Sequence, residues 1–321
     1  MTDPDLITVI VPCHNAERTL ERTLASISRQ TYRQIEILIV DDGSTDGSAR
    51  VAEAFVARDP RARLISQANA GVAAARNSGL AAARGAFVAP IDADDLWAPE
   101  KLELQLQRFT DPKVGVVYAW FENIDLNDRI FSGGFRFSFE GDVLADLCDV
   151  DFVGNGSNAM MRTALVRQVG GYDPGLRAKG AEGCEDWRLW LALAEFCEFA
   201  VVRRPLTGYR IYRGNMSSRN ARMIASAELV AQAIAERHPE LRARLSVHLT
   251  GRELHGFLRC AKQGQWRDAQ TMLGRLSHRS ARTVARQTLG IAGSTLGGLP
   301  AKVRRRLQLS GVHERTPFIT A

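Results

Sequence analysis

The stretch Ala86-Phe-Val-Ala-Pro-Ile-Asp-Ala-Asp-Asp95 begins with apolar residues and ends in three carboxylates, those of Asp92, Asp94 and Asp95. A short apolar run without helical spacing predicts a buried strand, so the carboxylates follow at its C-terminal end. In an open, mostly parallel α/β sheet, ligands bind in the crevice outside that end of the strands. Crowded acids repel one another, and hard oxygen ligands of this kind recruit Mg²⁺ or Mn²⁺. The alternative is an acidic turn before a helix that begins near Pro99, with Asp95 as its N-cap.

Apolar runs and segments with helical spacing alternate before this stretch. The predicted elements are, in order, strand 6–11, helix 17–29, strand 35–40, helix 48–58, strand 62–67 and helix 71–83. Strands separated by helices of this length indicate βαβ units and a parallel sheet. The strand 35–40 also ends in acids, Asp41 and Asp42. Two strands therefore place carboxylates at one edge, and we expect an acidic pocket that needs a cation or a hydrogen-bond donor.

The composition of the chain is that of a soluble globular protein, with 321 residues of which 45% are hydrophobic. Its five cysteines are scattered and form no C-x-x-C pair, which argues against a disulfide framework or a zinc site and for a reducing cytosol. The N-terminus carries no signal-peptide pattern, and no apolar run approaches the roughly 20 residues of a membrane span. We expect a cytoplasmic protein that is at most peripheral at the inner face of the cell membrane.

Positive charge is concentrated at the C-terminal end of the chain. From Gly274 onward the sequence has eight Arg and one Lys against one Glu, whereas the preceding chain is slightly acidic. Such a basic tail suits an anionic membrane surface, and a solvated tail without fixed structure is the alternative. No recognised nucleic-acid-binding motif accompanies the charge, so we expect no nucleic-acid partner.

The turn after the first strand, Pro12-Cys-His-Asn-Ala-Glu17, contains no glycine. A dinucleotide-binding Rossmann domain would place a Gly-rich turn there, so that helix amides face a pyrophosphate. The P-loop pattern G-x-x-x-x-G-K-[ST] is also absent from the sequence. A dehydrogenase and a P-loop enzyme are therefore poor interpretations.

Five motifs follow one another in the first hundred residues: Val9-Ile-Val-Pro-Cys-His-Asn15, Gln30-Thr-Tyr32, Val40-Asp-Asp-Gly-Ser-Thr-Asp46, Gly71-Val-Ala-Ala-Ala-Arg-Asn-Ser-Gly79 and Ile91-Asp-Ala-Asp-Asp95. In this order they closely resemble the motifs of the family 2 glycosyltransferases of the GT-A fold. A looser resemblance continues to about residue 220. The resemblance implies an α/β GT-A fold with a mostly parallel, Rossmann-like sheet flanked by helices and a C-terminal helical extension. We expect a catalytic domain at 1–220, with a nucleotide-sugar half at 1–112 and an acceptor half at 113–220, followed by helices and the basic tail at 221–321.

The resemblance implies roles for residues of the first half. Asp42 would accept a hydrogen bond from the nucleobase, and Asp94 would bind Mg²⁺ or Mn²⁺ directly, with Asp92 near the ribose or the metal's waters. The other predicted nucleotide-sugar contacts are Pro12, Asn15, Glu17, Arg76 and Arg213. Arg210 is also expected to close over the diphosphate. For Arg76, the alternative is an exposed position on an Ala-rich helix.

The second half is expected to bind the acceptor. Glu185-Asp186 matches an acidic pair whose Asp, in inverting members of the family, takes the proton from the acceptor hydroxyl. An N-cap role for Asp186 is compatible with this. Glu185, Trp187 and Asn158 are predicted on the acceptor side. We expect a core strand at 114–120, a flexible or hairpin-like loop over the site at 130–140, and successive helices beyond residue 222.

The resemblance implies a metal-dependent, inverting glycosyltransferase that moves a sugar from a nucleotide-diphosphate sugar, UDP- or dTDP-linked, to a hydroxyl acceptor. The acceptor would be a glycan or lipid-linked glycan in cell-surface polysaccharide, glycolipid or glycoconjugate synthesis. The Gln-x-x-Arg-Trp motif of processive members is absent, so single-sugar transfer is expected. The alternatives are an inactive nucleotide-sugar-binding or scaffold protein, and a nucleotidyltransferase.

Overall fold

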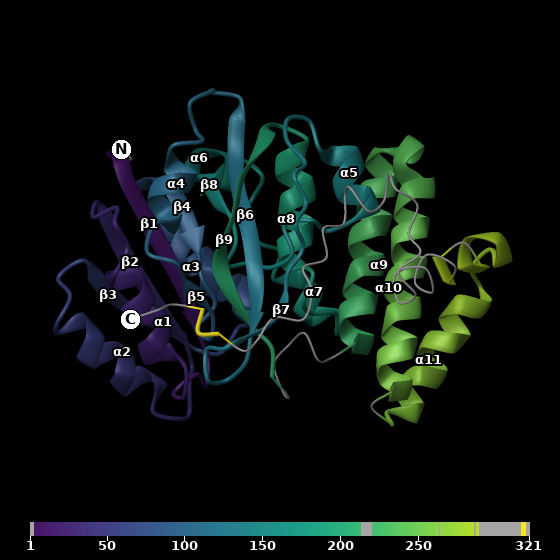
Figure 1. The fold of residues 1–321 in the computed structure, drawn as a ribbon, viewed down its shortest axis with the longest axis horizontal. Coiled ribbons are helices and arrows are strands. Elements are labelled where there is room, and N and C mark those ends of the chain that lie inside the picture. The colour runs from purple at the N-terminus through teal and green to yellow at the C-terminus, as the bar shows by residue number, and fades with distance from the viewer. Residues whose placement is uncertain (1–2, 213–219, 263, 286, 289–315, 319–321) are drawn as a thin grey trace.

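The computed structural model describes residues 3–212, 220–262, 264–285, 287–288 and 316–318. Within these residues a nine-stranded sheet has the order β3-β2-β1-β4-β8-β6-β9-β5, with β7 beside β6 (Figure 1). The strands are β1 (Asp3–Cys13), β2 (Ile35–Asp42), β3 (Ala62–Gln67), β4 (Gly85–Pro90), β5 (Leu96–Trp97), β6 (Val114–Ile124), β7 (Ile130–Gly133), β8 (Met160–Arg162) and β9 (Glu198–Arg210).

The first half of the sheet is parallel, as the alternation of strands and helices predicts. Val9 of β1 is in register with Ile37 of β2 and with Ala89 of β4. The connecting helices are α1 (Leu20–Ser28), α2 (Ser48–Val56) and α3 (Val72–Ala82). Strand β2 is buried along its whole length and ends at Asp42, so its last residue is one of the predicted site acids.

The second half of the sheet mixes strand directions. Strand β8 runs antiparallel to β4 and β6, β9 runs parallel to β6, and β5 runs antiparallel to β9. The predicted core strand at 114–120 is confirmed as part of β6. The N-cap alternative for Asp95 is wrong, because β5 follows it directly and helix α4 (Lys101–Leu106) has Glu100 at its N-cap.

Each face of the sheet carries its own hydrophobic core. Ile7, Val9 and Val11 of β1 pack with residues of α1, α2 and α4, whereas Ile10 packs with residues of α3 and of helices from the second half. Side chains that alternate between two covered faces are the reason why the strands are apolar throughout. The remaining helices are α5 (Leu144–Asp149), α6 (Thr163–Gln168), α7 (Gly175–Ala178), α8 (Glu185–Ala194), α9 (Asn220–Arg237), η2 (Pro239–Leu241), α10 (Arg242–Lys262) and α11 (Trp266–Ser277).

The predicted C-terminal helices are present and lie at the opposite end of the molecule from β3 (Figure 1). Helix α9 packs against α8, and α10 packs against α5 and α11. None of the helices in the described ranges is long and apolar enough to cross a membrane. Residues 316–318 return to β7, where Ile130 N donates to Thr316 O at 2.9 Å and Phe318 N donates to Asp128 O at 3.0 Å. Most of the predicted basic tail, residues 289–315, lies outside the described residues.

The predicted hairpin at 130–140 is confirmed, because β7 pairs antiparallel with β6, but no residue of this segment lines the pocket described below, which corrects its predicted place over the site. Phe137 is buried and Phe139 is partly buried, and their rings stack with the centroids 5.6 Å apart, whereas Phe135 is 44% exposed. Trp120 Nε1 donates to Phe137 O at 2.8 Å, and the Tyr118 hydroxyl donates to Phe139 O at 3.0 Å. Strand β6 therefore holds the backbone of this segment through two hydrogen bonds, and Phe137 is the alternating phenylalanine that is buried in the core.

Candidate active site

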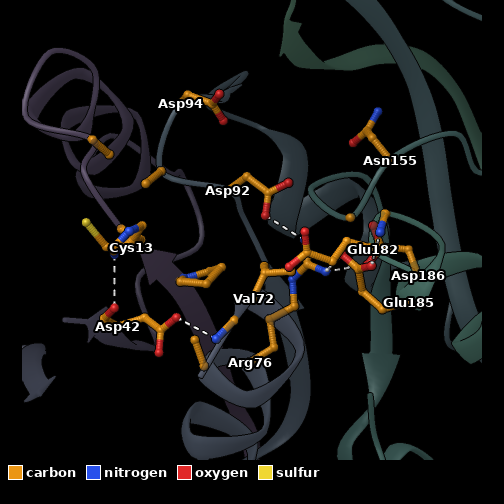
Figure 2. A pocket seen from close by; sticks show the side chains of 18 of the residues that line it. Cys13, Asp42, Val72, Arg76, Asp92, Asp94, Asn155, Glu182, Glu185 and Asp186 are labelled. Carbon is orange, nitrogen blue, oxygen red and sulfur yellow. Dashed lines mark hydrogen bonds and ion pairs between the residues drawn. The ribbon is translucent and has the colours of Figure 1, made fainter. Parts of the chain in front are cut away.

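A pocket of ≈ 650 Å³ opens beyond the carboxyl ends of β1, β2 and β4 (Figure 2). Asp42 lines it from the end of β2, and Asp92 and Asp94 line it from the turn after β4. Asp186 lines it from the start of α8, and Arg252 reaches it from α10. The acids that sequence places at two separate strand ends therefore share one cleft.

The guanidinium of Arg76, on α3, joins the two sides of this pocket (Figure 2). Its Nη2 donates to Asp92 Oδ1 at 2.6 Å, and its Nη1 donates to Asp186 Oδ1 at 2.6 Å and reaches Glu185 Oε1 at 3.5 Å. The Arg76 side chain is only 2% exposed. A buried charge is tolerated only when it is paired, so these acids and Arg76 hold one another in place.

Gly156 leaves the space that this ion-pair network needs. A Cβ atom at this position would lie 2.5 Å from Arg76 Nη2 and 2.9 Å from Asp186 Oδ2. On another side of the guanidinium, the ring centroid of Tyr172 lies 5.1 Å from Arg76 Cζ, which adds a cation–π contact. The arginine is thus enclosed by segments from both halves of the chain.

The carboxylate of Asp42 organises the other end of the pocket. Its Oδ1 accepts hydrogen bonds from Gln67 Nε2 at 2.7 Å and Ala70 N at 2.8 Å, and its Oδ2 accepts one from Gly71 N at 2.8 Å. Gly71 has φ of 92°, a conformation that favours glycine. A carboxylate offers about four acceptor positions. Asp42 therefore retains capacity for one further donor.

The three acids after β4 differ in their surroundings. Burial, reinforced by the charge of Asp92, raises the pKa of Asp94 to about 6, and the Tyr212 hydroxyl bond opposes this rise. Asp95 is fully buried and accepts hydrogen bonds from Ser157 Oγ at 2.5 Å and Arg210 N at 2.8 Å. Asp95 therefore fixes the turn from below, while Asp92 and Asp94 face the pocket.

Asp186 is the second residue of α8, whose N-cap is Cys184. The N-cap role considered for Asp186 alongside catalysis is therefore wrong. Its side chain is 21% exposed, and its Oδ1 is bound to Arg76. Burial raises the pKa of the Asp186 carboxyl, and the Arg76 guanidinium opposes that shift. The Oδ2 atom has no hydrogen-bond partner among the described residues, so it is the oxygen that can accept a proton from a ligand.

Residues 8–170 match the family model of glycosyl transferase family 2. An uncharacterized glycosyltransferase of Nostoc sp. is 34% identical over 237 residues, which cover 71% of this chain and 71% of the relative. The chain belongs to glycosyl transferase family 2. Four other curated bacterial relatives are matched over only 18% to 50% of their own lengths.

Solved structures share the fold of this family 2 chain. Residues 1–349 of the S. aureus protein TarS, in complex with UDP-GlcNAc, superpose with a TM-score of 0.62 at 20% identity, over 86% of this chain and 80% of that TarS fragment. The mannosyltransferase PcManGT of Pyrobaculum calidifontis, in complex with GDP-Man and Mn²⁺, has a TM-score of 0.57 at 22% identity, over 93% of this chain and 82% of that protein. The predicted GT-A fold is confirmed.

Most site residues predicted for the family 2 chain line the same pocket. They are Pro12, Asn15, Asp42, Arg76, Asp92, Asp94, Glu185, Asp186 and Trp187. Their individual roles stay predictions. The exposed-helix alternative for Arg76 is wrong, because its guanidinium is enclosed by carboxylates. Arg213 lies outside the described residues.

Two residues predicted to bind ligands in the family 2 site lie outside the pocket lining. Glu17 Oε2 accepts from Gly47 N at 3.1 Å, so its carboxylate supports the turn before α2. Asn158 is 0% exposed, and its Nδ2 donates to Ala119 O at 2.7 Å and Val153 O at 2.8 Å. The structure corrects the assignment of Asn158, because its amide is buried and already bonded inside the fold. The Glu17 carboxylate is 48% exposed, and its contact with the nucleotide stays a prediction.

Arg210 supports the acidic turn of the family 2 site from within. Its Nε donates to Asp94 O at 2.5 Å, and its Nη2 pairs with Asp128 Oδ1 at 2.5 Å. The side chain is fully buried. The expectation that Arg210 closes over a diphosphate is therefore corrected, because its guanidinium lies beneath the turn and positions Asp94.

Sequence reasoning on this family 2 chain did not single out Asn155, Asp151 or Arg252, which all line the pocket. Asn155 stands between two glycines, and such a turn could have indicated a side chain presented to a cleft. Arg252 lies 68 residues after Cys184 and contacts its Sγ at 3.3 Å. It also lies beyond the family resemblance, so no sequence pattern indicated it.

Proposed function

We propose that this chain transfers a single sugar from a nucleoside diphosphate sugar, UDP- or dTDP-linked, to a hydroxyl group of a glycan or lipid-linked glycan, with inversion at the anomeric carbon. The observation that carries the proposal is the Arg76 bridge, because it holds Asp92 of the D-x-D turn and Asp186 in one pocket. TarS was solved with UDP-GlcNAc in the same fold, which supports a nucleotide-sugar donor.

Asp186 acts as the general base in this proposal. Oδ2 takes the proton of the acceptor hydroxyl as the acceptor oxygen attacks the anomeric carbon, and the bond from that carbon to the diphosphate oxygen breaks. The electron pair of the broken bond leaves with the nucleoside diphosphate. A single displacement inverts the configuration. Arg76 holds Asp186 Oδ1 during this step and so keeps Oδ2 aimed at the acceptor.

The acids of the turn after β4 fit a divalent cation. The raised pKa of Asp94, caused by burial and by Asp92, indicates negative charge that the protein compensates incompletely. Asp94 would hold Mg²⁺ or Mn²⁺ directly, and Asp92 would hold it through water. No three His, Cys, Asp or Glu side chains of the described residues form a complete metal site, and Mg²⁺ commonly binds through one or two carboxylates plus substrate phosphates. When bound, such a cation stabilises negative charge on the leaving diphosphate.

Nucleotide sugars are expected to raise the melting temperature of the protein only when Mn²⁺ is present. A ligand at a hundredfold excess over its Kd stabilises the native state by about 2.7 kcal/mol. Thermal melts with UDP-glucose, UDP-GlcNAc and dTDP-glucose, each with Mn²⁺ or with EDTA, provide the measurement. In Asp94→Asn, nucleotide sugars should no longer raise the melting temperature, whether Mn²⁺ or EDTA is present. Stabilisation without any release of UDP or dTDP would support the inactive binding protein instead.

Contact of the basic tail with a membrane remains a prediction from sequence, since Lys302-Val-Arg-Arg-Arg306 lies outside the described residues. Replacing its four cations with Gln is expected to weaken binding to phosphatidylglycerol vesicles by about 1 kcal/mol per charge at low salt. Vesicle co-sedimentation measures this, and phosphatidylcholine vesicles serve as the uncharged control. Equal sedimentation of both proteins with both lipids would contradict the predicted contact.

A further inference from the structure

Asn155 is a buried polar side chain that the fold leaves without a partner. It lines the pocket and is 7% exposed, yet neither Oδ1 nor Nδ2 has a hydrogen-bond partner among the described residues. Figure 2 shows its amide apart from the cluster around Arg76, with no bond drawn to it. Buried amides are nearly always hydrogen-bonded, so an unpartnered one at a pocket wall indicates a bound group.

An ion pair between Asp151 and Arg252 lines the same pocket as this amide. Gly154 N, next to Asn155 in sequence, approaches Asp151 Oδ1 at 3.4 Å, and Arg252 Nη2 approaches Asp151 Oδ2 at 3.5 Å. Arg252 Cζ lies 5.2 Å from the ring centroid of Trp187, which fixes the plane of the guanidinium. Both ionic side chains are partly exposed and line the pocket. Helix α10 therefore contributes to the pocket although it lies outside the family match.

The charges of the pocket disfavour an anionic acceptor. Among its described lining residues, seven are acidic and four are arginines. Each arginine is paired with an acid, the pairs being Arg76–Asp92, Arg177–Glu182, Arg210–Asp128 and Arg252–Asp151. A nucleoside diphosphate sugar with one divalent cation would leave this excess of acids in place. A carboxylate or phosphate on the acceptor would therefore meet repulsion in a poorly screened site.

We propose that Asn155 and the Asp151–Arg252 pair form an acceptor subsite for an uncharged sugar residue, with α10 completing it. The proposal rests on the proposed transferase function and adds the class of acceptor. The amide of Asn155 and the guanidinium of Arg252 donate hydrogen bonds, while the amide oxygen and the Asp151 carboxylate accept them. Neighbouring hydroxyls of a neutral hexose need both kinds of partner.

Paired acceptors that differ in one group test this subsite. p-Nitrophenyl β-glucoside and p-nitrophenyl β-glucuronide differ only in a hydroxymethyl or a carboxylate group at C5. With Mn²⁺ and each of UDP-glucose and UDP-GlcNAc, product formation is compared with UDP release in the absence of acceptor. We expect the glucoside to exceed the glucuronide about tenfold or more in kcat/KM. Equal or better use of the glucuronide overturns the proposal.

Asn155→Ala is expected to lower the ratio of transfer to acceptor-free UDP release by about 10- to 100-fold, mainly through the KM for the glucoside. Arg252→Lys keeps the positive charge but loses the planar fork, and it should raise that KM about tenfold. An unchanged ratio and an unchanged KM in these variants overturn the subsite.

Asn158→Ala is the matched control for folding. Asn158→Ala removes the hydrogen bonds to Ala119 O and Val153 O, whereas Asn155→Ala removes no side-chain hydrogen bond seen in the described residues. Only Asn158→Ala should therefore lower the melting temperature. An equal drop for Asn155→Ala would assign Asn155 a structural role and overturn the subsite. UDP release without transfer to the glucoside overturns the subsite but leaves the proposed function standing. Absence of UDP or dTDP release with UDP-glucose, UDP-GlcNAc and dTDP-glucose overturns both.

Discussion

Asp186→Asn is expected to lower kcat for sugar transfer by about 100- to 10,000-fold while nucleotide binding persists. An amide cannot take the proton that the acceptor hydroxyl must lose, but its oxygen can still accept the hydrogen bond from Arg76 Nη1. The network that now holds Asp186 at 2.6 Å from Arg76 therefore stays largely in place. Release of UDP or dTDP measures turnover, and calorimetric titration with the nucleoside diphosphate measures binding.

The pH dependence of the unsubstituted protein provides a second readout of the same base. Burial raises the pKa of Asp186, so the carboxyl becomes protonated at a higher pH than an ordinary Asp, whose pKa is about 3.9. A protonated carboxyl cannot accept the acceptor's proton. We therefore expect kcat to fall as the pH decreases, with a midpoint above the ordinary value.

Asp149→Asn is the matched control for this experiment. Asp149 is an exposed acid outside the pocket lining, and its partner is Arg244. Its substitution should leave kcat and the pH profile unchanged. Transfer at the normal rate in Asp186→Asn would remove the general-base role and with it the proposed mechanism.

Arg76→Met is expected to destabilise the protein by about 3–5 kcal/mol and to remove transfer activity. The substitution leaves Asp92, Glu185 and Asp186 without the buried cation that now lies between them. Mutual repulsion should separate the D-x-D turn from the start of α8. The midpoint of urea unfolding measures the loss of stability, and nucleotide release measures the loss of turnover.

Two further variants test whether the Arg76 bridge is responsible for the expected losses of stability and activity. Arg76→Lys keeps a charge, but a single ammonium lacks the planar fork that spans Asp92 and Asp186. We expect it to recover part of the stability and little of the activity. Arg58→Met changes an exposed arginine that bonds only to Ala54 O among the described residues, and it should change stability by about 0.5 kcal/mol or less. An unfolding midpoint for Arg76→Met equal to that of Arg58→Met would contradict the buried bridge.

The parallel half of the fold could be predicted because its signals are local. Apolar runs locate β1, β2 and β4, and the helices between them oblige the strands to run in the same direction. The acids at the ends of β2 and β4 must then meet at one edge. The direction of β8 and β9 could not be inferred in this way, since their antiparallel and parallel pairings join residues far apart in the chain.

Side chains that are close together in sequence also point in different directions, which local sequence patterns do not predict. Asn155 and Asn158 lie in one short segment, yet the first faces the pocket unpartnered and the second bonds internally to β6. The sequence predicted that Arg210 binds a diphosphate, but its guanidinium lies beneath the turn, where it donates to Asp128 and to the Asp94 carbonyl. In each case the contacts of a neighbouring element decided the direction of the side chain.

The order of residues by itself determined the family, the parallel sheet and the gathering of carboxylates at its edge, because periodicity and strand direction are properties of short segments. Tertiary structure alone decided that Arg76 would bind Asp186, 110 residues away, and that Arg252 of α10 would reach the same pocket. The physical reason is that pairing between distant charges depends on how whole elements pack. The free energy of burying Arg76 is acceptable only after that packing has brought its acids to it.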